Sequence, residues 1–388
     1  MNFAISTELR ELVDRTRVFS EEELAPLEPA FLQDGWLDEG VRLDLQLKAR
    51  DGGLWAIDVP VELGGAGYGH VGHCLVTEEL YKSPLMFDFG GSPYPVLYEA
   101  TDDQKRRYLH PVVEGTKRGV AVAFTEPSTG SDLGAIETTA VRDGEHYVIN
   151  GEKKFIGFVD RSDYLLLFAS TDRDAGARGI SVFLVDVDTP GFEVLGRLPT
   201  MGDGWWPFEL RFEDMRVSAA NLLGEPNEGF RVADTELTHG RLWIAAIQLG
   251  LAQRAIDVAL EHARQRTTWG QPIGSRQGVQ FMLADSQVEL EAARALVYKA
   301  AWLADNGEPF RQQTFMAKLY ATEMAQRVTD RCLQIMGGLG YLRECPIQSL
   351  YRQARVWRIG HGTAEIHRWM IARDMLGPVA AVTVTATA

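Results

Sequence analysis

Cysteine is scarce in this sequence, and this scarcity excludes two classes of protein. Cys74, Cys332 and Cys345 are the only cysteines in 388 residues, and none belongs to a Cys-x-x-Cys pair. They provide neither a disulfide framework nor the ligand set of a zinc site. So few cysteines fit a reducing compartment, and we expect a cytoplasmic protein.

The sequence also lacks a long uncharged apolar run. Its most apolar stretch, residues 242–260, is interrupted by Gln248, Arg254 and Asp257, so we expect a buried helix and no membrane span. The first residues contain acidic side chains and lack the basic start, apolar block and small-residue cleavage site of a secretory signal.

Positive charge is in deficit. The chain has 39 Lys and Arg against 54 Asp and Glu, which gives a formal net charge of −15 at pH 7. Such a chain repels a phosphate backbone, so we expect no nucleic-acid partner. Hydrophobic content of 45% and charged content of 24% are typical of a globular protein, and the length exceeds that of one compact core.

Hydrophobic periodicity divides the chain into three parts and predicts an α+β protein. Residues 1–118 have helical spacing, residues 119–232 contain short β-type runs between turn signals, and residues 233–378 return to helical spacing. We therefore expect an N-terminal helical domain, a middle β-domain (a small barrel or sandwich), a C-terminal four-helix bundle and a loose tail at 379–388. The expected strands are 120–124, 147–149, 164–168, 180–185, 208–212 and 215–217, and the expected bundle helices are 237–266, 277–306 and 310–336.

Two patterns near the N-terminus resemble binding motifs without their usual context. Segment 67–72 matches Gly-x-Gly-x-x-Gly, but Pro60 breaks the short apolar run before it and no βαβ unit follows. We therefore reject a dinucleotide-binding sheet here. His70, His73 and Cys74 have a spacing that metal ligands use, but no distant ligands complete a site, and we expect no metal.

Five stretches carry the clearest functional signal. They are FTEPSTGSD at 124–132, NGEKKFI at 150–156, RTTWGQPI at 266–273, QIMGGLGY at 334–341 and RQARVWRIGHGTAEIHRWMIAR at 352–373. The last stretch ends one helix at Gly360-His361-Gly362 and starts another, with Thr363 as a favoured N-cap and Glu365 in the first turn. Free N–H groups at such a helix start can hold phosphate.

Together these stretches resemble the acyl-CoA dehydrogenase family, and the resemblance covers about residues 5–377. It implies bound FAD, removal of an α-proton from an acyl-CoA thioester and transfer of a β-hydride to flavin N5. It also implies a homo-oligomer, either a dimer or a tetramer, and an electron-transfer flavoprotein as partner.

The resemblance assigns roles to individual residues. The implied FAD-binding residues are Phe124, Thr125, Ser131, Phe155, Gly157, Arg266, Trp269, Gln277, Gln334, Gly337, Gly338, Thr363 and Glu365. The implied substrate contacts are Ser131, Arg241 and Gly362, and Tyr94, Leu97 and Trp243 are expected to line the acyl pocket. In the family, the residues matching Gln277, Gln334, Gly337 and Gly338 often contact the cofactor of a neighbouring subunit.

The sequence departs from the family where the catalytic base is expected. Many members carry a Glu immediately before the Gly-Thr pair, where this chain has His361. Others carry it just before the arginine that matches Arg241, where this chain has Gly240. Gly157 replaces the Thr or Ser that the family usually places beside flavin N5.

Several explanations of the missing Glu remain open. The first explanation is that His361 itself is the base, because an ordinary histidine pKa near 6.5 suits proton abstraction at neutral pH. Alternatively Asp88, which lies between aromatic residues, supplies a carboxylate from another wall. A third explanation is a flavin-dependent monooxygenase or oxidase on the same fold, and a fourth is a non-catalytic subunit of a hetero-oligomeric dehydrogenase. The motifs favour dehydrogenase chemistry.

Overall fold

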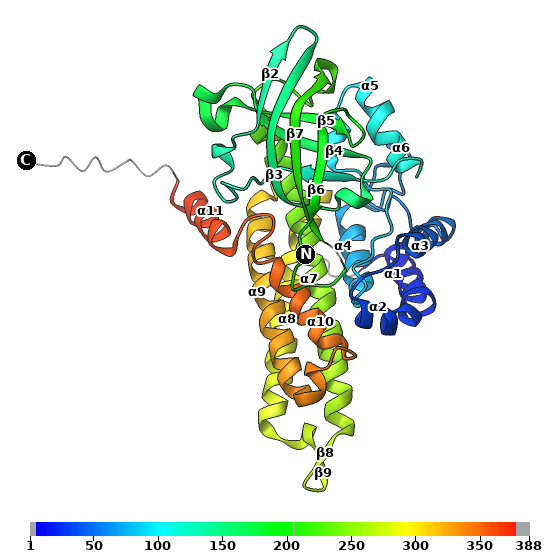
Figure 1. Ribbon diagram of the computed structural model, residues 1–388. Coiled ribbons are helices and arrows are strands. Elements are labelled where there is room, and N and C mark those ends of the chain that lie inside the picture. The colour runs from blue at the N-terminus through cyan, green and yellow to red at the C-terminus, as the bar shows by residue number, and fades with distance from the viewer. Residues whose placement is uncertain (1–4, 205, 378–388) are drawn as a thin grey trace, which may run out of the picture.

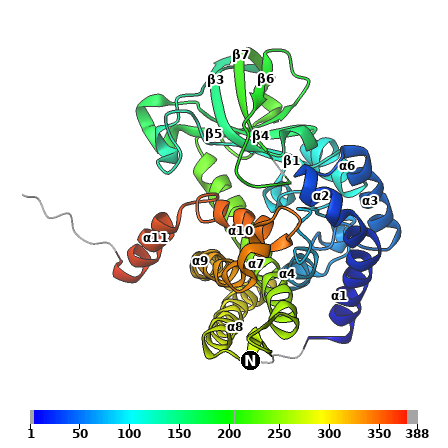
Figure 2. The same cartoon turned by 60° about the horizontal axis from the view of Figure 1, so that its bottom comes forward.

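The computed structural model describes residues 5–204 and 206–377, so the tail expected at 379–388 lies outside the described residues. Helices form the N-terminal and C-terminal parts, and a β-sheet forms the middle part (Figure 1). The N-terminal helices lie beside the long C-terminal helices, and the sheet covers one end of both (Figures 1 and 2). This confirms the α+β order expected from the sequence.

The N-terminal part docks on the rest of the protein through helix α4. The helices of this part are α1 (Thr7–Phe19), α2 (Glu28–Asp34), α3 (Glu39–Asp51), α4 (Gly69–Leu80), α5 (Asp102–Gln104) and α6 (His110–Val113). Residues 74–80 of α4 are all buried, because α4 packs against α1 and against two long helices, α7 (Gly229–Gln265) and α8 (Gln277–Asp305). The glycine-rich segment 67–72 follows no strand, since the first strand of the described residues begins at Val120.

The contact between α4 and α7 depends on Gly250. A Cβ at this position would lie 2.4 Å from the carbonyl oxygen of Glu78 and 2.9 Å from the carbonyl carbon of Tyr81. We expect Gly250→Ala to lower the free energy of unfolding by about 1 to 3 kcal/mol in urea denaturation, because backbone atoms must move. Gly278→Ala is the matched helical control, since its Cβ would meet no atom within 4 Å. An equal loss of stability in both variants would contradict this explanation.

The middle part is one curled sheet. Its strands are β1 (Val120–Ala123), β2 (Thr139–Asp143), β3 (His146–Gly157), β4 (Tyr164–Ser170), β5 (Ile180–Asp186), β6 (Phe192–Arg197) and β7 (Pro207–Ser218). Within the described residues they form a seven-stranded sheet with the order β1-β4-β2-β3-β7-β6, and β5 pairs with β4. Every residue of β4 is buried. Its alternate side chains enter two separate apolar clusters, so both faces of the sheet are covered here.

Two details of the sheet differ from the expectation. Segments 208–212 and 215–217 were expected to be a pair of strands, but both belong to the continuous strand β7. The polar residues between them form an irregularity in the ladder, where Asp214 has a φ of +44° and its N–H donates to the side-chain oxygen of Asn150 at 2.8 Å. Strands β2 and β6 were not expected, because most of their residues are exposed and they lack a strict apolar alternation.

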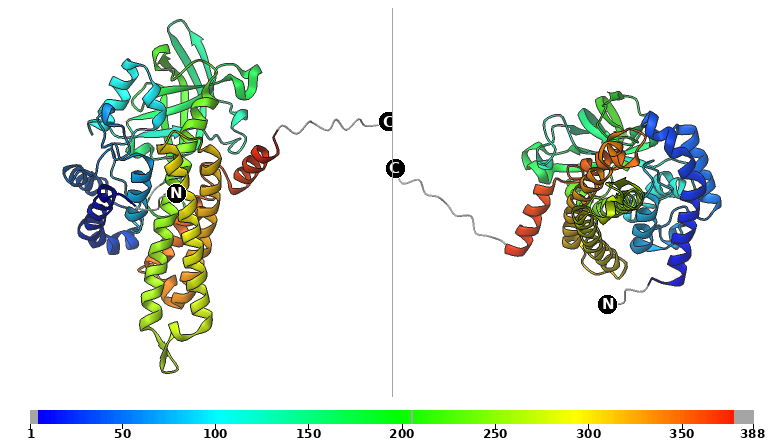
Figure 3. Two further views of the ribbon diagram at one scale, coloured as in Figure 1. Left: turned by 180° about the vertical axis from the view of Figure 1, so that it is seen from behind. Right: turned by 90° about the horizontal axis from the view of Figure 1, so that it is seen from below.

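The C-terminal part confirms the expected bundle. Its further elements are α9 (Arg311–Met336), α10 (Pro346–Val356), α11 (Ala364–Leu376) and a hairpin of β8 (Thr267–Thr268) and β9 (Gln271–Pro272). Helices α7, α8 and α9 pack together, α10 packs against α7 and α9, and α11 projects from the bundle (Figures 2 and 3).

Helix α7 links the sheet to the far tip of the bundle. It has 37 residues, which corresponds to a length of about 55 Å, and the β8-β9 hairpin caps its far end (Figure 1). By length and composition α7 resembles a membrane span, but 72% of its most apolar window is buried inside the protein. This is the burial expected of a core helix.

Candidate active site

The turn that carries His361 is held from behind by a buried lysine. Lys318 of α9 is fully buried, and its ammonium group donates to the carbonyl oxygens of Gly360 at 2.9 Å and Gly362 at 2.7 Å. Burial, together with the charge of Arg241, lowers the pKa of Lys318 to about 7. These bonds stabilise a turn in which His361 has a φ of +52° and Gly362 a φ of +91°.

Arg241 also donates a hydrogen bond to this turn. It is buried, and its Nε donates to the carbonyl oxygen of His361 at 3.4 Å. Its guanidinium lies 4.5 Å from the ring centre of Phe315. Arg241 is not among the residues that line the neighbouring cavity, so its expected contact with an acyl-CoA remains a prediction.

The ring of His361 rests directly against Gly240. A Cβ at position 240 would lie 2.9 Å from His361 Nδ1, so the glycine makes room for the imidazole. Burial, followed by the charges of Lys318 and Arg241, lowers the pKa of His361 to about 3. The imidazole is therefore neutral at pH 7 and far less basic than an ordinary histidine, which argues against the expectation that His361 is the base.

A cavity of about 480 Å³ lies between the N-terminal helices, the sheet and α7. Gly240, Trp243, Tyr94 and Asp88 are among the residues that line it. Asp88 therefore shares a cavity with one of the two positions at which the base was expected. Leu97, which was expected in the same wall, is instead fully buried in the apolar cluster beside the sheet.

A buried ion pair shapes the loop after β1. Lys153 of β3 donates to the carboxylate of Glu126 at 2.8 Å and to the carbonyl oxygen of Phe124 at 3.0 Å. Glu126 also accepts from the N–H groups of Glu137 and Thr138, and both members of the pair are buried. The pair thus ties the loop that contains Thr125 and Ser131 to β3.

The predicted flavin residues of the β-domain lie on this loop and on β3. The Phe124 ring stacks on Phe168 at 4.1 Å, and the carbonyl oxygen of Thr125 accepts from the N–H of Lys154. Ser131 is exposed. Phe155 is 60% exposed with a φ of +60°, and Gly157 ends β3. An exposed aromatic ring beside open hydroxyl and backbone groups is suited to holding a planar ring system.

The start of α11 has the geometry expected from the sequence. Thr363 is the N-cap, and its side-chain oxygen accepts from the N–H of Ile366 at 3.3 Å. Glu365 is exposed in the first turn of the helix. Both residues follow closely after the turn that Lys318 holds.

The remaining predicted flavin residues lie at the far tip of the bundle. Trp269, in the β8-β9 hairpin, is 91% exposed with a φ of +48°. Arg266, Gln277, Gln334, Gly337 and Gly338 are exposed at the same tip, which is formed by the ends of α7, α8 and α9. Arg266 follows Arg241 along α7 by about 37 Å. Within one chain, the predicted flavin contacts therefore form two groups that lie far apart.

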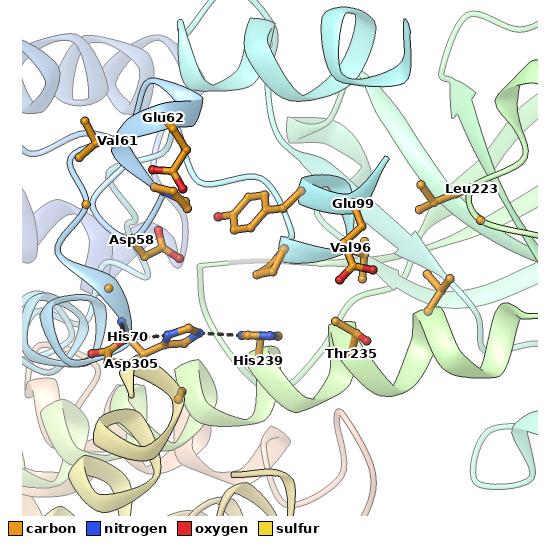
Figure 4. A pocket seen from close by; sticks show the side chains of 18 of the residues that line it. Asp58, Val61, Glu62, His70, Val96, Glu99, Leu223, Thr235, His239 and Asp305 are labelled. Carbon is orange, nitrogen blue, oxygen red and sulfur yellow. Dashed lines mark hydrogen bonds and ion pairs between the residues drawn. The ribbon is translucent and has the colours of Figure 1, made fainter. Parts of the chain in front are cut away.

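The histidines of α4 are paired with protein groups. His70 Nδ1 lies 2.9 Å from Asp305 Oδ1, and His70 Nε2 lies 2.8 Å from His239 Nδ1. Figure 4 shows this chain of bonds at the floor of a second cavity of about 630 Å³. His73 pairs instead with Asp58 at 3.3 Å. No group of three or more His, Cys, Asp or Glu residues that could hold a metal ion occurs among the described residues.

Sequence reasoning missed three buried charged groups, which are Lys153, Lys318 and Glu236. Glu236 of α7 is only 1% exposed, and burial, opposed by Arg241, raises its pKa to about 7. The sequence contained one signal for it. Glu236 lies one helical turn before Gly240, on the side of α7 that faces the protein interior.

Comparison with known proteins supports the expectation from the motifs. Family models for the N-terminal, middle and C-terminal domains of acyl-CoA dehydrogenase match residues 6–116, 121–215 and 227–376. A probable acyl-CoA dehydrogenase of Bacillus subtilis, YngJ, is 37% identical, with 97% of this chain and 100% of the relative covered. The CarC subunit of the caffeyl-CoA reductase-Etf complex of Acetobacterium woodii is 37% identical, with 84% and 87% covered. The structure of butyryl-CoA dehydrogenase from Megasphaera elsdenii has a TM-score of 0.90 at 32% identity, with 97% and 100% covered.

Proposed function

Because this chain belongs to the acyl-CoA dehydrogenase family of FAD-dependent oxidoreductases, we propose that it removes an α-proton from an acyl-CoA thioester. Bound FAD supplies the acceptor for the hydride that leaves the β-carbon. The protein supplies the position of the thioester, the base and the exclusion of water. The observation that carries this proposal is the cavity of about 480 Å³, which is lined by Gly240 and by residues of the N-terminal part.

The residues present fit an FAD molecule in two places. On the β-domain, the exposed ring of Phe155 and the open groups of Thr125 and Ser131 suit the flavin end. At the bundle tip, Gly337 and Gly338 have no atom within 4 Å of an added Cβ, so a ligand can approach their backbone closely. The guanidinium of Arg266 suits a diphosphate.

These two places belong to different copies of the chain in the proposed assembly. The tip lies too far from the β-domain of its own chain to share one FAD with it. A neighbouring copy that presents its tip to this β-domain completes the site, and a closed homo-oligomer, a dimer or a tetramer, provides this arrangement. The exposed Trp269 is then covered in the assembly, which explains a 91% exposed indole in one chain.

An electron-transfer flavoprotein is the proposed partner that reoxidises the flavin. Support comes from the name of the CarC relative, which is a subunit of a reductase-Etf complex. The same name shows that relatives include reductases, so the physiological direction of this chain depends on its partner. We place the protein in the cytoplasm, as its cysteine usage suggests.

The proposed function predicts a yellow protein that reacts with acyl-CoA in the absence of oxygen. Purified protein should release FAD on denaturation, and a matching acyl-CoA should bleach the flavin absorbance anaerobically. An oxidase or monooxygenase would require oxygen for turnover, and a non-catalytic subunit would bleach only when co-expressed with a Glu-bearing relative. A colourless protein that FAD fails to reconstitute would refute the proposal.

A further inference from the structure

The two positions at which relatives carry the catalytic Glu meet at one point in this structure. These positions hold Gly240 and His361, which are far apart in the sequence. A Cβ built on Gly240 would lie 2.9 Å from Nδ1 and 3.0 Å from Cε1 of the His361 ring. Neither residue provides a carboxylate, and the ring would have to shift to admit a side chain at position 240.

A third residue reaches the same point. The side chain of Glu236, one turn before Gly240 on α7, places its Oε1 atom 3.5 Å from the position of that Cβ. A carboxylate oxygen of Glu236 and the His361 ring therefore both lie against the side of Gly240 that has no side chain. Gly240 lines the cavity of about 480 Å³, and Glu236, which is not itself among the lining residues, adjoins that cavity through Gly240.

The carboxylate of Glu236 has one buried oxygen without a hydrogen-bond partner. Its Oε1 is buried and has no hydrogen-bond partner among the described residues, and the same is true of His361 Nδ1. A buried carboxylate oxygen without a donor is costly for stability, because it has lost its hydrogen bonds to water and gained none in the protein. Such a cost is typical of functional groups, which are kept for their chemistry.

The charges around Glu236 suit a base that works near neutral pH. Arg241 on the same helix favours the carboxylate, whereas burial disfavours it, and the net result is a pKa of about 7. Lys318 of α9 lies behind the turn and is bonded to carbonyl oxygens. Tyr94 faces Glu236 from the N-terminal part with its pKa raised by burial and by this carboxylate. His361 is neutral.

We propose that Glu236 is the catalytic base of this protein, acting from one helical turn before the position that some relatives use. This proposal rests on the proposed function. The Glu236 carboxylate takes the α-proton of the thioester and becomes a carboxylic acid. The two electrons of the α-C–H bond form the new carbon–carbon double bond, the β-hydride leaves with its own two electrons to FAD, and Glu236 returns the proton to solvent after product release.

In this arrangement His361 is a positioning residue. Its uncharged ring fills the space beside Gly240 and limits where the Glu236 carboxylate can move. Asp88, the other carboxylate considered, lines the cavity of about 480 Å³. It is the next candidate for the catalytic base if Glu236 fails the test.

The test is Glu236→Gln in the FAD-loaded protein. Glutamine keeps the shape but cannot accept the proton, so we expect anaerobic flavin bleaching to slow by about 100-fold or more. A second readout is exchange of the α-hydrogens of the acyl-CoA in D₂O, followed by mass spectrometry, which should be lost equally. FAD absorbance per subunit should stay at the wild-type value.

Two further variants keep the result interpretable. Glu236→Asp retains a carboxyl group, so it should keep exchange at a reduced rate even if the glutamine variant folds poorly. In wild type the bleaching rate should rise with pH through about 7, because the base must be ionised, and this rise should be absent in Glu236→Gln. Glu225→Gln, an exposed change before the same helix, is the matched control and should behave as wild type.

The outcomes separate this inference from the proposed function. A wild-type protein that neither bleaches nor exchanges with straight, branched or cyclic acyl-CoA would refute both. A reactive wild type whose Glu236→Gln variant is equally reactive would overturn only the assignment of Glu236. If His361→Gln or Asp88→Asn abolishes the reaction and Glu236→Gln does not, the assignment of Glu236 is overturned and the other residue is identified as the base.

Discussion

Replacing Lys153 by methionine should lower the free energy of unfolding by about 3 to 5 kcal/mol. Lys153 is 1% exposed and Glu126 is 3% exposed, so the substitution leaves a buried carboxylate without its countercharge. The N–H groups of Glu137 and Thr138 still donate to Glu126 and compensate only in part. Urea denaturation at pH 7 measures the effect, and the loop of residues 124–138 should become sensitive to proteolysis.

The loss should depend on pH in a defined direction. In the native protein burial tends to raise the pKa of Glu126, but Lys153 and the N–H donors lower it below the usual 4.5. Burial lowers the pKa of Lys153 to about 8, so the pair is complete between pH 4.5 and about 8, and its stabilisation of the Glu126 carboxylate is lost as the pH falls through the lower folded pKa of Glu126. In the variant the unpaired carboxyl group instead favours its neutral form. The difference between the two proteins should be largest near pH 7 and should shrink in acid.

A double variant provides the control for this prediction. Glu126→Gln combined with Lys153→Met removes both charges and keeps an acceptor for the N–H groups, so it should recover part of the lost stability. A Lys153→Met protein as stable as wild type at pH 7 would show that the pair contributes nothing. A loss of stability of the same size at every pH would show that Glu126 is not charged in the folded protein.

Truncating the exposed tip of the bundle should remove FAD from the protein without unfolding the chain. Arg266→Ala and Trp269→Ala each delete a side chain that makes few contacts within its own subunit, because both residues are exposed. We expect an FAD affinity at least about 10-fold lower, which corresponds to about 1.4 kcal/mol. The helix content of the apo-protein should be unchanged in circular dichroism. Bound FAD is measured by absorbance after gel filtration.

Mixing two defective variants tests whether the tip serves a neighbouring copy. One variant carries Arg266→Ala at the tip, and the other carries Phe155→Ala on the β-domain. After joint refolding, mixed oligomers contain some sites built from two intact halves, so FAD binding should return in part. As a control, Glu11→Ala on the exposed surface of α1 replaces either change. No recovery in mixtures, with both single variants defective, would place the whole site in one chain.

Much of the fold follows from local signals. Thr363 is an N-cap as expected, because a hydroxyl followed by a helical sequence satisfies the first N–H groups wherever it occurs. Helices α8 and α9 begin and end within one residue of their expected limits, since glycine and proline corners act locally. Helix α7 begins at Gly229, eight residues before the expected start. Strand β6 was missed because its residues are exposed and carry no apolar alternation. The break expected inside β7 was wrong because Asn150 of the neighbouring strand bridges it.

The candidate site likewise has features that the sequence predicts and features that only the folded structure decides. The sequence by itself determined which motifs are present, the family and the use of FAD, because these depend on residue types at short spacings. Only the tertiary structure decided that Gly240 touches His361, that the flavin residues lie in two distant groups, and that Glu236 lies in the interior beside both expected base positions. A pKa depends on which charges and how much water surround a group. Chain segments far apart in sequence supply those surroundings, and they meet only in the folded protein.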